Sequence, residues 1–125
     1  MNKHEHRVQN SHLVIRSKAD SYSWGKNCHA INLVDEENIS IKEELIPPGE
    51  SETVHLHEYA SQFFYILSGQ AHFVINGNVH EVTAGNGIWV KNGDQHKISN
   101  KSTENLVFLV TSNPPVNQDR LEITE

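Results

Sequence analysis

The sequence predicts an all-β protein whose two sheets pack as a jelly roll, and three observations support this fold class. Short runs of β-branched and aromatic residues recur along the chain at regular spacing. Turn-forming residues separate these runs, and no segment of ten or more residues shows the period of an amphipathic helix. The runs number about nine or ten, which fits the strands of a double-sheet jelly roll.

The first expected strands cover residues 12–17, 29–34 and 37–46. Side chains two residues apart in a strand share one face. In the third strand, two sets therefore alternate: Ile39, Ile41, Glu43 and Leu45 on one face, and Ser40, Lys42 and Glu44 on the other. Because the first set is mainly apolar, it is expected to face the interior, which would turn Glu43 inward. A position at the rim explains Glu43 equally well.

The remaining strands are expected after the turn sequence PPGE at residues 47–50. Asn76 and Gly77 separate two of them, and this pair tolerates the positive φ angles of a tight hairpin turn. Aromatic residues at 64, 65, 89 and 108 are expected in the core or in the wall of a cavity. The expected strands are residues 53–57, 62–67, 70–75, 79–83, 87–90, 96–99 and 105–112.

The chain is expected to form one domain. At 125 residues it has the length of a single domain, and it shows no internal repeat and no linker. Residues 1–10 are predicted to be a flexible N-terminal arm, residues 11–113 the domain, and residues 114–125 an extended C-terminal tail. A last edge strand within this tail is an open alternative.

Charge and composition limit the partners that we expect. The net charge is −6, from 10 Lys and Arg against 16 Asp and Glu, and the scattered basic residues offer no surface for phosphate backbones. No apolar run approaches the roughly 20 residues of a membrane span, and the N-terminus has no apolar signal segment. Cys28 is the only cysteine, which agrees with a reducing compartment. We expect a cytoplasmic protein that binds neither nucleic acid nor membrane.

Two of the nine histidines stand in the H-x-H pair formed by His55 and His57. In a strand this spacing places both imidazoles on one face, as a shared metal ion requires. The pair alone is weak evidence, because residues 4–6 form a second H-x-H pair without supporting context. Glu58 adjoins the pair, but it would point to the opposite face of a continuing strand.

The spacing around the pair resembles the cupin superfamily. Its first motif, G-x5-H-x-H-x3,4-E-x6-G, corresponds to Gly49, His55, His57, Gln62 and Gly69. Its second motif, G-x5-P-x-G-x2-H-x3-N, corresponds to Gly85, Lys91, Gly93, His96 and Asn100. Every gap matches over residues 49–100, with two departures: Gln62 replaces the usual Glu, and Lys91 replaces the usual Pro.

The resemblance implies a cupin jelly-roll β-barrel with site residues His55, His57, Gln62 and His96. These residues would bind one divalent transition metal, Mn²⁺, Fe²⁺, Ni²⁺ or Zn²⁺, with the Gln62 amide oxygen as a neutral fourth ligand. Three neutral imidazoles and an amide leave the full +2 charge on the ion, which makes it a stronger Lewis acid. A hydrogen-bonded polar cluster without metal is the alternative interpretation.

The function implied by the resemblance is metal-dependent chemistry on a small organic molecule. Dioxygenation, decarboxylation and isomerisation are the candidate reactions, with a dioxygenase-like or other metal-dependent enzyme as the first interpretation. Glu43, if it faces inward, is the candidate acid or base. A cupin of the sugar isomerase or epimerase kind and a non-catalytic ligand-binding module are the alternatives. Small cupins commonly pair through their sheets, so a homodimer is also expected.

Overall fold

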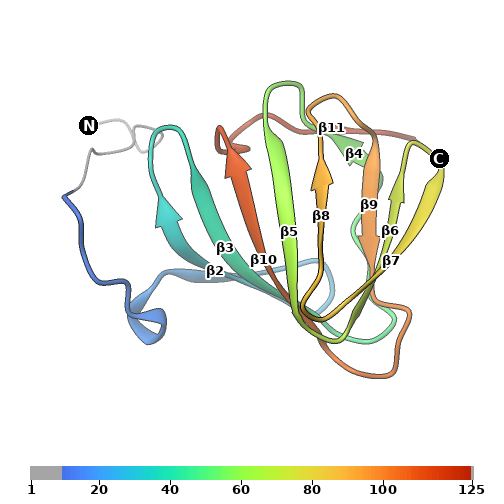
Figure 1. Ribbon diagram of the computed structural model, residues 1–125, viewed down its shortest axis with the longest axis horizontal. Helices are drawn as coiled ribbons and strands as arrows, with labels where there is room; N and C mark the ends of the chain where they lie inside the picture. Colours follow the sequence, from blue (N-terminus) through green and yellow to red (C-terminus); the bar gives the residue numbers. More distant parts are fainter. Residues whose placement is uncertain (1–9, 125) are drawn as a thin grey trace.

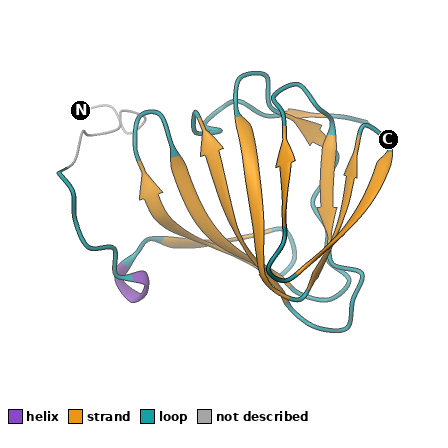
Figure 2. Cartoon of the chain, in the orientation of Figure 1, coloured by secondary structure: helices purple, strands orange, loops and turns teal. Residues whose placement is uncertain are grey.

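Two antiparallel sheets face each other in the computed structural model, which describes residues 10–124 (Figure 1 and Figure 2). One sheet has the order β1-β2-β3-β10-β5-β8 and the other β11-β4-β9-β6-β7. This arrangement confirms the predicted all-β jelly-roll fold. The first sheet contains β1 (Ser21–Trp24), β2 (Cys28–Asp35), β3 (Ser40–Ile46), β10 (Leu106–Asn113), β5 (Ser61–Ser68) and β8 (Gly87–Val90). The second contains β11 (Leu121–Glu122), β4 (His55–Leu56), β9 (His96–Ser99), β6 (Gln70–Ile75) and β7 (Asn78–Thr83).

Strands expected between residues 29 and 112 are present, most within a few residues of their predicted bounds. The expected strand at 12–17 is wrong, because its last residues start the 3-10 helix η1 (Arg16–Lys18) and the rest is irregular. Its apolar side chains have no strand partner, and Leu13 is 81% exposed. The missed strand β1 follows instead, paired with β2 across a tight turn. The predicted arm at 1–10 lies almost wholly outside the described residues.

The prediction that Glu43 faces inward is wrong. Its carboxylate accepts hydrogen bonds from the Arg16 guanidinium on the outer surface, at 3.0 Å from Nε and 2.6 Å from an Nη. Lys42 and Glu44, on the opposite face of β3, line the interior cavity instead. Alternation identifies two faces but not which one is inside. The inner face of β3 is polar because it borders a cavity. The expectation that the mainly apolar face points inward therefore selected the wrong face.

The apolar core lies between the sheets beside this cavity. On β5 the side chains alternate as expected, with Phe64 and Ile66 buried. Tyr65 and Trp89, predicted in the core or a cavity wall, are 38% and 58% exposed. Within the described residues, no helix is long and apolar enough to cross a membrane. The tail at 114–125 contains β11, which pairs with β4 and so reaches the strand that carries the first histidine.

Candidate metal centre

Three histidines meet at one end of the barrel interior. His55 lies in β4, His57 follows that strand directly, and His96 begins β9, where it is the register partner of His55. Their exposed fractions are 2%, 3% and 1%. One ligand nitrogen from each ring lies within 4.8 Å of the others. The backbone N–H of Gly93 donates to the His57 carbonyl at 2.7 Å, which connects the two sequence motifs directly.

Each histidine is held in the same tautomer. The Nδ1 atoms of His55 and His96 bond to the carbonyls of Thr53 and Asp94 at 2.8 and 2.9 Å, and the Nδ1 of His57 bonds to the Asp119 carbonyl. Because a carbonyl oxygen can only accept, each Nδ1 carries the proton and each Nε2 keeps a free lone pair. Hydrogen bonds of this kind, from Nδ1 to a backbone carbonyl, orient imidazoles that bind a metal through Nε2.

Protonation does not compete for these nitrogens near neutral pH. Burial lowers the pKa of His55 to about 3 and that of His96 to about 4, and the carbonyl hydrogen bonds oppose the shift only in part. Burial also lowers the pKa of His57. The rings are therefore neutral, which is the form that binds a metal.

Gln62 completes the cluster from β5. Its Nε2 donates to the Ser112 hydroxyl on the neighbouring strand β10 at 3.1 Å, which fixes the amide and leaves Oε1 free. Within residues 10–124, Gln62 Oε1 and His96 Nε2 are both buried and without a hydrogen-bond partner. An unmet buried polar group costs on the order of 1–3 kcal/mol. Gln62 Oε1 and His96 Nε2 are both acceptors, and the Nε2 lone pairs of His55 and His57 lie beside them. Four lone pairs at one place suit a bound cation.

Asp119 in the C-terminal segment supports the site from outside. Its carbonyl accepts from His57, and its carboxylate accepts the backbone N–H groups of Glu58, Tyr59 and Ala60 at 2.7, 3.0 and 2.9 Å. Burial alone would raise the pKa of Asp119, but these three N–H groups outweigh it and hold the pKa below its ordinary value. Sequence reasoning missed this residue, because no local pattern relates it to His57.

Two carboxyl groups line the cavity within the described residues, and neither was a predicted site residue. Glu52 Oε1 lies 4.0 Å from His55 Nε2 and accepts a hydrogen bond from the Ile98 N–H at 3.2 Å. Its side chain is 13% exposed. Glu44 projects from β3. Glu58 is exposed as predicted, but it lies in a bend beyond the end of β4 and not in a continuing strand. The structure therefore brings His55, His57, Gln62 and His96 together but leaves Glu43 on the outer surface.

Both cavity carboxyls hold protons more tightly than usual. Burial raises the pKa of Glu44 to about 7, against the opposing influence of Lys42 and Trp24. Burial, reinforced by the negative charge of Glu44, raises the pKa of Glu52 to about 8. The alternating polar face of β3 was the sequence signal for Glu44. Residues 52–54 lie outside the strands, so no alternation argument applied to Glu52.

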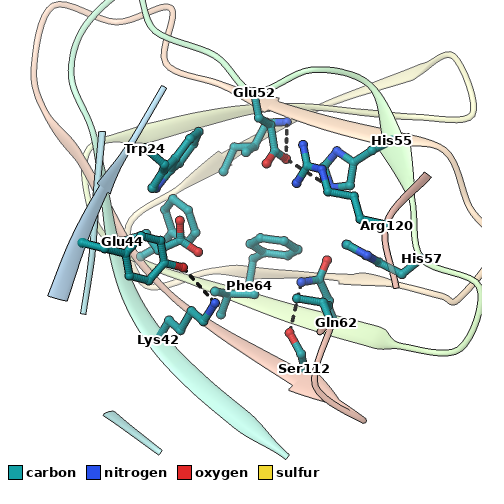
Figure 3. Close-up of a pocket in the computed structure, with 15 residues that line it drawn as sticks. Trp24, Lys42, Glu44, Glu52, His55, His57, Gln62, Phe64, Ser112 and Arg120 are labelled. Carbon is teal, nitrogen blue, oxygen red and sulfur yellow. Dashed lines mark hydrogen bonds and ion pairs between the residues drawn. The ribbon is translucent and has the colours of Figure 1, made fainter. Parts of the chain in front are cut away.

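The cavity has a volume of about 370 Å³. In Figure 3, Trp24, Lys42 and Glu44 lie on one side of the cavity, and His55, His57 and Arg120 lie on the other. Phe64 lies between the two groups. The lining residues are Tyr22, Trp24, Lys42, Glu44, Glu52, His55, His57, Gln62, Phe64, Ile98, Phe108, Val110, Ser112, Val116 and Arg120.

Glu44 gives a pH-dependent prediction for the metal-free protein. Its pKa is about 7 when folded against an ordinary value of 4.5, so its stabilising contribution is complete below pH 4.5 and is lost as the pH rises through 7. Relative to Glu44→Gln, the wild-type free energy of unfolding should fall by about 2 kcal/mol between pH 5 and pH 8. Urea denaturation of both proteins at both pH values measures this difference. Parallel pH profiles would contradict the assigned environment of Glu44.

Comparison with known proteins identifies the fold and the family whose model matches the chain. The model of the cupin domain matches residues 42–112. An RmlC-like cupin from Shewanella frigidimarina NCIMB 400 superposes with a TM-score of 0.78 at 19% identity, covering 88% of this chain and 96% of that one. No curated protein matches the chain.

Two further solved structures share the fold. The polyketide cyclase RemF from Streptomyces resistomycificus has a TM-score of 0.77 at 21% identity, over 93% of this chain and 87% of that one. A predicted oxalate decarboxylase from Thermotoga maritima has a TM-score of 0.73 at 23% identity, over 83% of this chain and all of that one, 100%. Identities this low establish the common fold and leave the chemistry to the residues of the site.

Proposed function

Because the chain belongs to the cupin family, whose domain model spans residues 42–112, we propose that it binds one divalent transition metal and acts on a small organic anion. The proposed ligands are Nε2 of His55, His57 and His96 and Oε1 of Gln62. One observation carries the proposal. Three imidazoles in the same tautomer surround one position, and two buried acceptors there have no other partner among residues 10–124.

The ligand set suits a first-row transition metal. Imidazole nitrogens bind Mn²⁺, Fe²⁺, Ni²⁺ and Zn²⁺, and an amide oxygen is an acceptable fourth donor. When bound, the metal would supply a Lewis acid that withdraws electron density from a substrate carbonyl. Because the four proposed ligands are neutral, the centre would keep its full charge and favour an anionic substrate.

The cavity walls favour the same class of substrate. Lys42 and Arg120 provide two cationic groups, while Phe64, Phe108 and Val110 provide apolar surface. A volume of about 370 Å³ lies within the range of small-molecule sites. The substrate would be a small carboxylate-bearing molecule held by charge at its polar ends and by apolar contact along its length.

Glu52 is the residue best placed to move a proton. It is the cavity carboxyl that approaches a proposed ligand, at 4.0 Å from His55 Nε2. In its deprotonated form, Glu52 would take a proton from the carbon beside a carbonyl. The C–H electron pair would form a carbon–carbon double bond as the carbonyl pair shifts to oxygen, and Glu52 would return the proton to that oxygen, which gives the enol. The product is an isomer, so no external oxidant or reductant is needed. We therefore favour isomerisation over the dioxygenation that the motifs also allow.

Substitution of Glu52 tests this assignment. Glu52→Gln should slow exchange of the C3 protons of 2-oxobutyrate with D2O by at least 100-fold, the usual contribution of a positioned acid or base. Glu43→Gln makes the same chemical change on the outer surface and should retain the wild-type rate. Proton NMR of the metal-loaded proteins measures the exchange, and metal analysis verifies equal loading.

Oxygen dependence separates the two reaction classes. The exchange rate should be the same under air and under nitrogen. Consumption of dioxygen coupled to loss of the 2-oxo acid would contradict the proton-transfer function. Metal binding without exchange on any member of a panel of small 2-oxo and hydroxy acids would leave a ligand-binding module as the better description.

A further inference from the structure

The side of the cavity opposite the histidines carries a second polar cluster, which contains none of the proposed metal ligands. Trp24 from β1 and Lys42 and Glu44 from β3 form this cluster, which we name the far-side cluster (Figure 3). Strand β10 separates β3 from β5, which carries Gln62. Two strand spacings place the backbones of β3 and β5 about 10 Å apart.

The indole of Trp24 has an unmet hydrogen bond. Its ring lines the cavity, and its buried Nε1 meets hydrogen-bond geometry with no acceptor in the described part of the chain, although it lies close enough to the Glu44 carboxyl to lower that group's pKa. Indole N–H can only donate. Buried Trp usually places this group against an acceptor. Because the Glu44 carboxyl makes no hydrogen bond of good geometry with it, an oxygen that arrives with a ligand would supply a better acceptor.

Lys42 supplies a second donor beside it. The ammonium group donates to the Tyr22 hydroxyl at 2.8 Å and lies 5.3 Å from the centre of the Tyr22 ring. These contacts hold the side chain at the cavity wall, and an ammonium group has three N–H donors. At least one donor of Lys42 is therefore available to a molecule in the cavity.

The pairing of β1 with β2 explains why Trp24 reaches this place. Trp24 is the register partner of Cys28, and the turn between them contains Gly25 and Asn27 at φ angles of 53° and 62°. Positive φ angles are accessible to Gly and Asn at little cost. This turn folds β1 back so that the indole both packs against the core cluster and lines the cavity.

We infer that the far-side cluster is a specificity subsite that binds an oxygen acceptor, a hydroxyl or a carboxylate, at the substrate end remote from the histidines. This inference rests on the proposed function, in which the other end of the anion binds beside the histidines. The substrate is thus a small organic acid with oxygen groups at both ends. An acid with an apolar far end would leave the Trp24 N–H unpaired.

Three five-carbon probes that differ only at the far end test the inference: valerate, 5-hydroxyvalerate and glutarate. Calorimetric titration of the metal-loaded protein should give Kd values for 5-hydroxyvalerate and glutarate at least 10-fold below that of valerate. Trp24→Phe removes the N–H without changing charge, and Lys42→Met removes the ammonium. Each variant should reduce the advantage to 3-fold or less while the metal content stays unchanged.

Matched variants outside the cavity control for the chemistry of the substitutions. Trp89→Phe, on an exposed part of β8, and Lys101→Met, on the surface, should keep the full advantage. Equal Kd values for the three probes in the wild type, absence of binding by all three, or an advantage that survives both cavity variants overturns the subsite. Metal analysis of the same samples reports separately on the proposed function. A wild-type protein that binds no metal would contradict that function, whatever the ratio of the Kd of valerate to those of the other two probes.

Discussion

Replacement of His96 by alanine is expected to weaken divalent metal binding by at least 100-fold. The ring is 1% exposed, its Nδ1 proton is committed to the Asp94 carbonyl, and its Nε2 has no partner among the described residues. Loss of a supporting residue alone typically costs a metal site 10- to 100-fold in affinity, so loss of a direct ligand should cost more. A 100-fold change corresponds to about 2.7 kcal/mol.

Titration of the metal-free proteins with Zn²⁺ and Mn²⁺ against a chromophoric chelator measures this effect. His80→Ala is the matched control, because His80 is exposed on β7 and should leave the affinity unchanged. Thermal unfolding provides a second reading. Metal at 100 times its Kd should stabilise the wild type by about 2.7 kcal/mol, and His96→Ala should lose that increment. An affinity within 3-fold of the wild type would remove His96 from the ligand set.

Asp119→Ala is expected to weaken both the fold and the site. Its carboxylate accepts three backbone N–H groups from the loop after His57. Hydrogen bonds to a charged acceptor contribute roughly 1.5–3 kcal/mol each, and partial exposure of this loop reduces their sum. We expect the free energy of unfolding to fall by about 2–4 kcal/mol. Because the Asp119 carbonyl orients His57, metal affinity should fall about 10-fold or more.

Urea denaturation and metal titration of one sample measure both consequences. Asp119→Asn keeps one acceptor oxygen and should fall between the wild type and Asp119→Ala. The pKa of Asp119 is held below its ordinary value of 3.8. Its contribution is therefore complete above pH 3.8 and is lost as the pH falls further, through the pKa of the folded state. Unchanged stability and affinity in Asp119→Ala would show that the C-terminal segment does not support the histidines.

Periodicity and spacing predicted the features that depend on local sequence. The strands from residue 29 to residue 112 follow alternation and turn residues, so most were placed within a few residues. The pair His55 and His57 follows from the two-residue period of a strand. Gln62 and His96 were selected by motif spacing, and the structure brings both to that pair.

The errors have a common physical origin in contacts between distant segments. Glu43 and Glu44 occupy opposite faces of β3, and only the packing of the whole barrel decides which face borders the cavity. The Asp119 contact to His57 spans 62 positions of the chain, too far for any local pattern to register. Glu52 precedes the strand that carries His55, so alternation did not apply to it.

Metal analysis of protein purified without added metal or chelator measures the occupancy of the proposed metal centre. We expect close to one divalent transition metal per chain in the wild type and in Gln62→Glu, which places a carboxylate at the fourth ligand. We expect less than about 0.1 metal per chain in His55→Ala and His96→Ala, because each variant loses a direct ligand. A wild-type content below about 0.1 per chain, unchanged by the His55 substitution, would contradict the metal centre and leave a hydrogen-bonded polar cluster in its place.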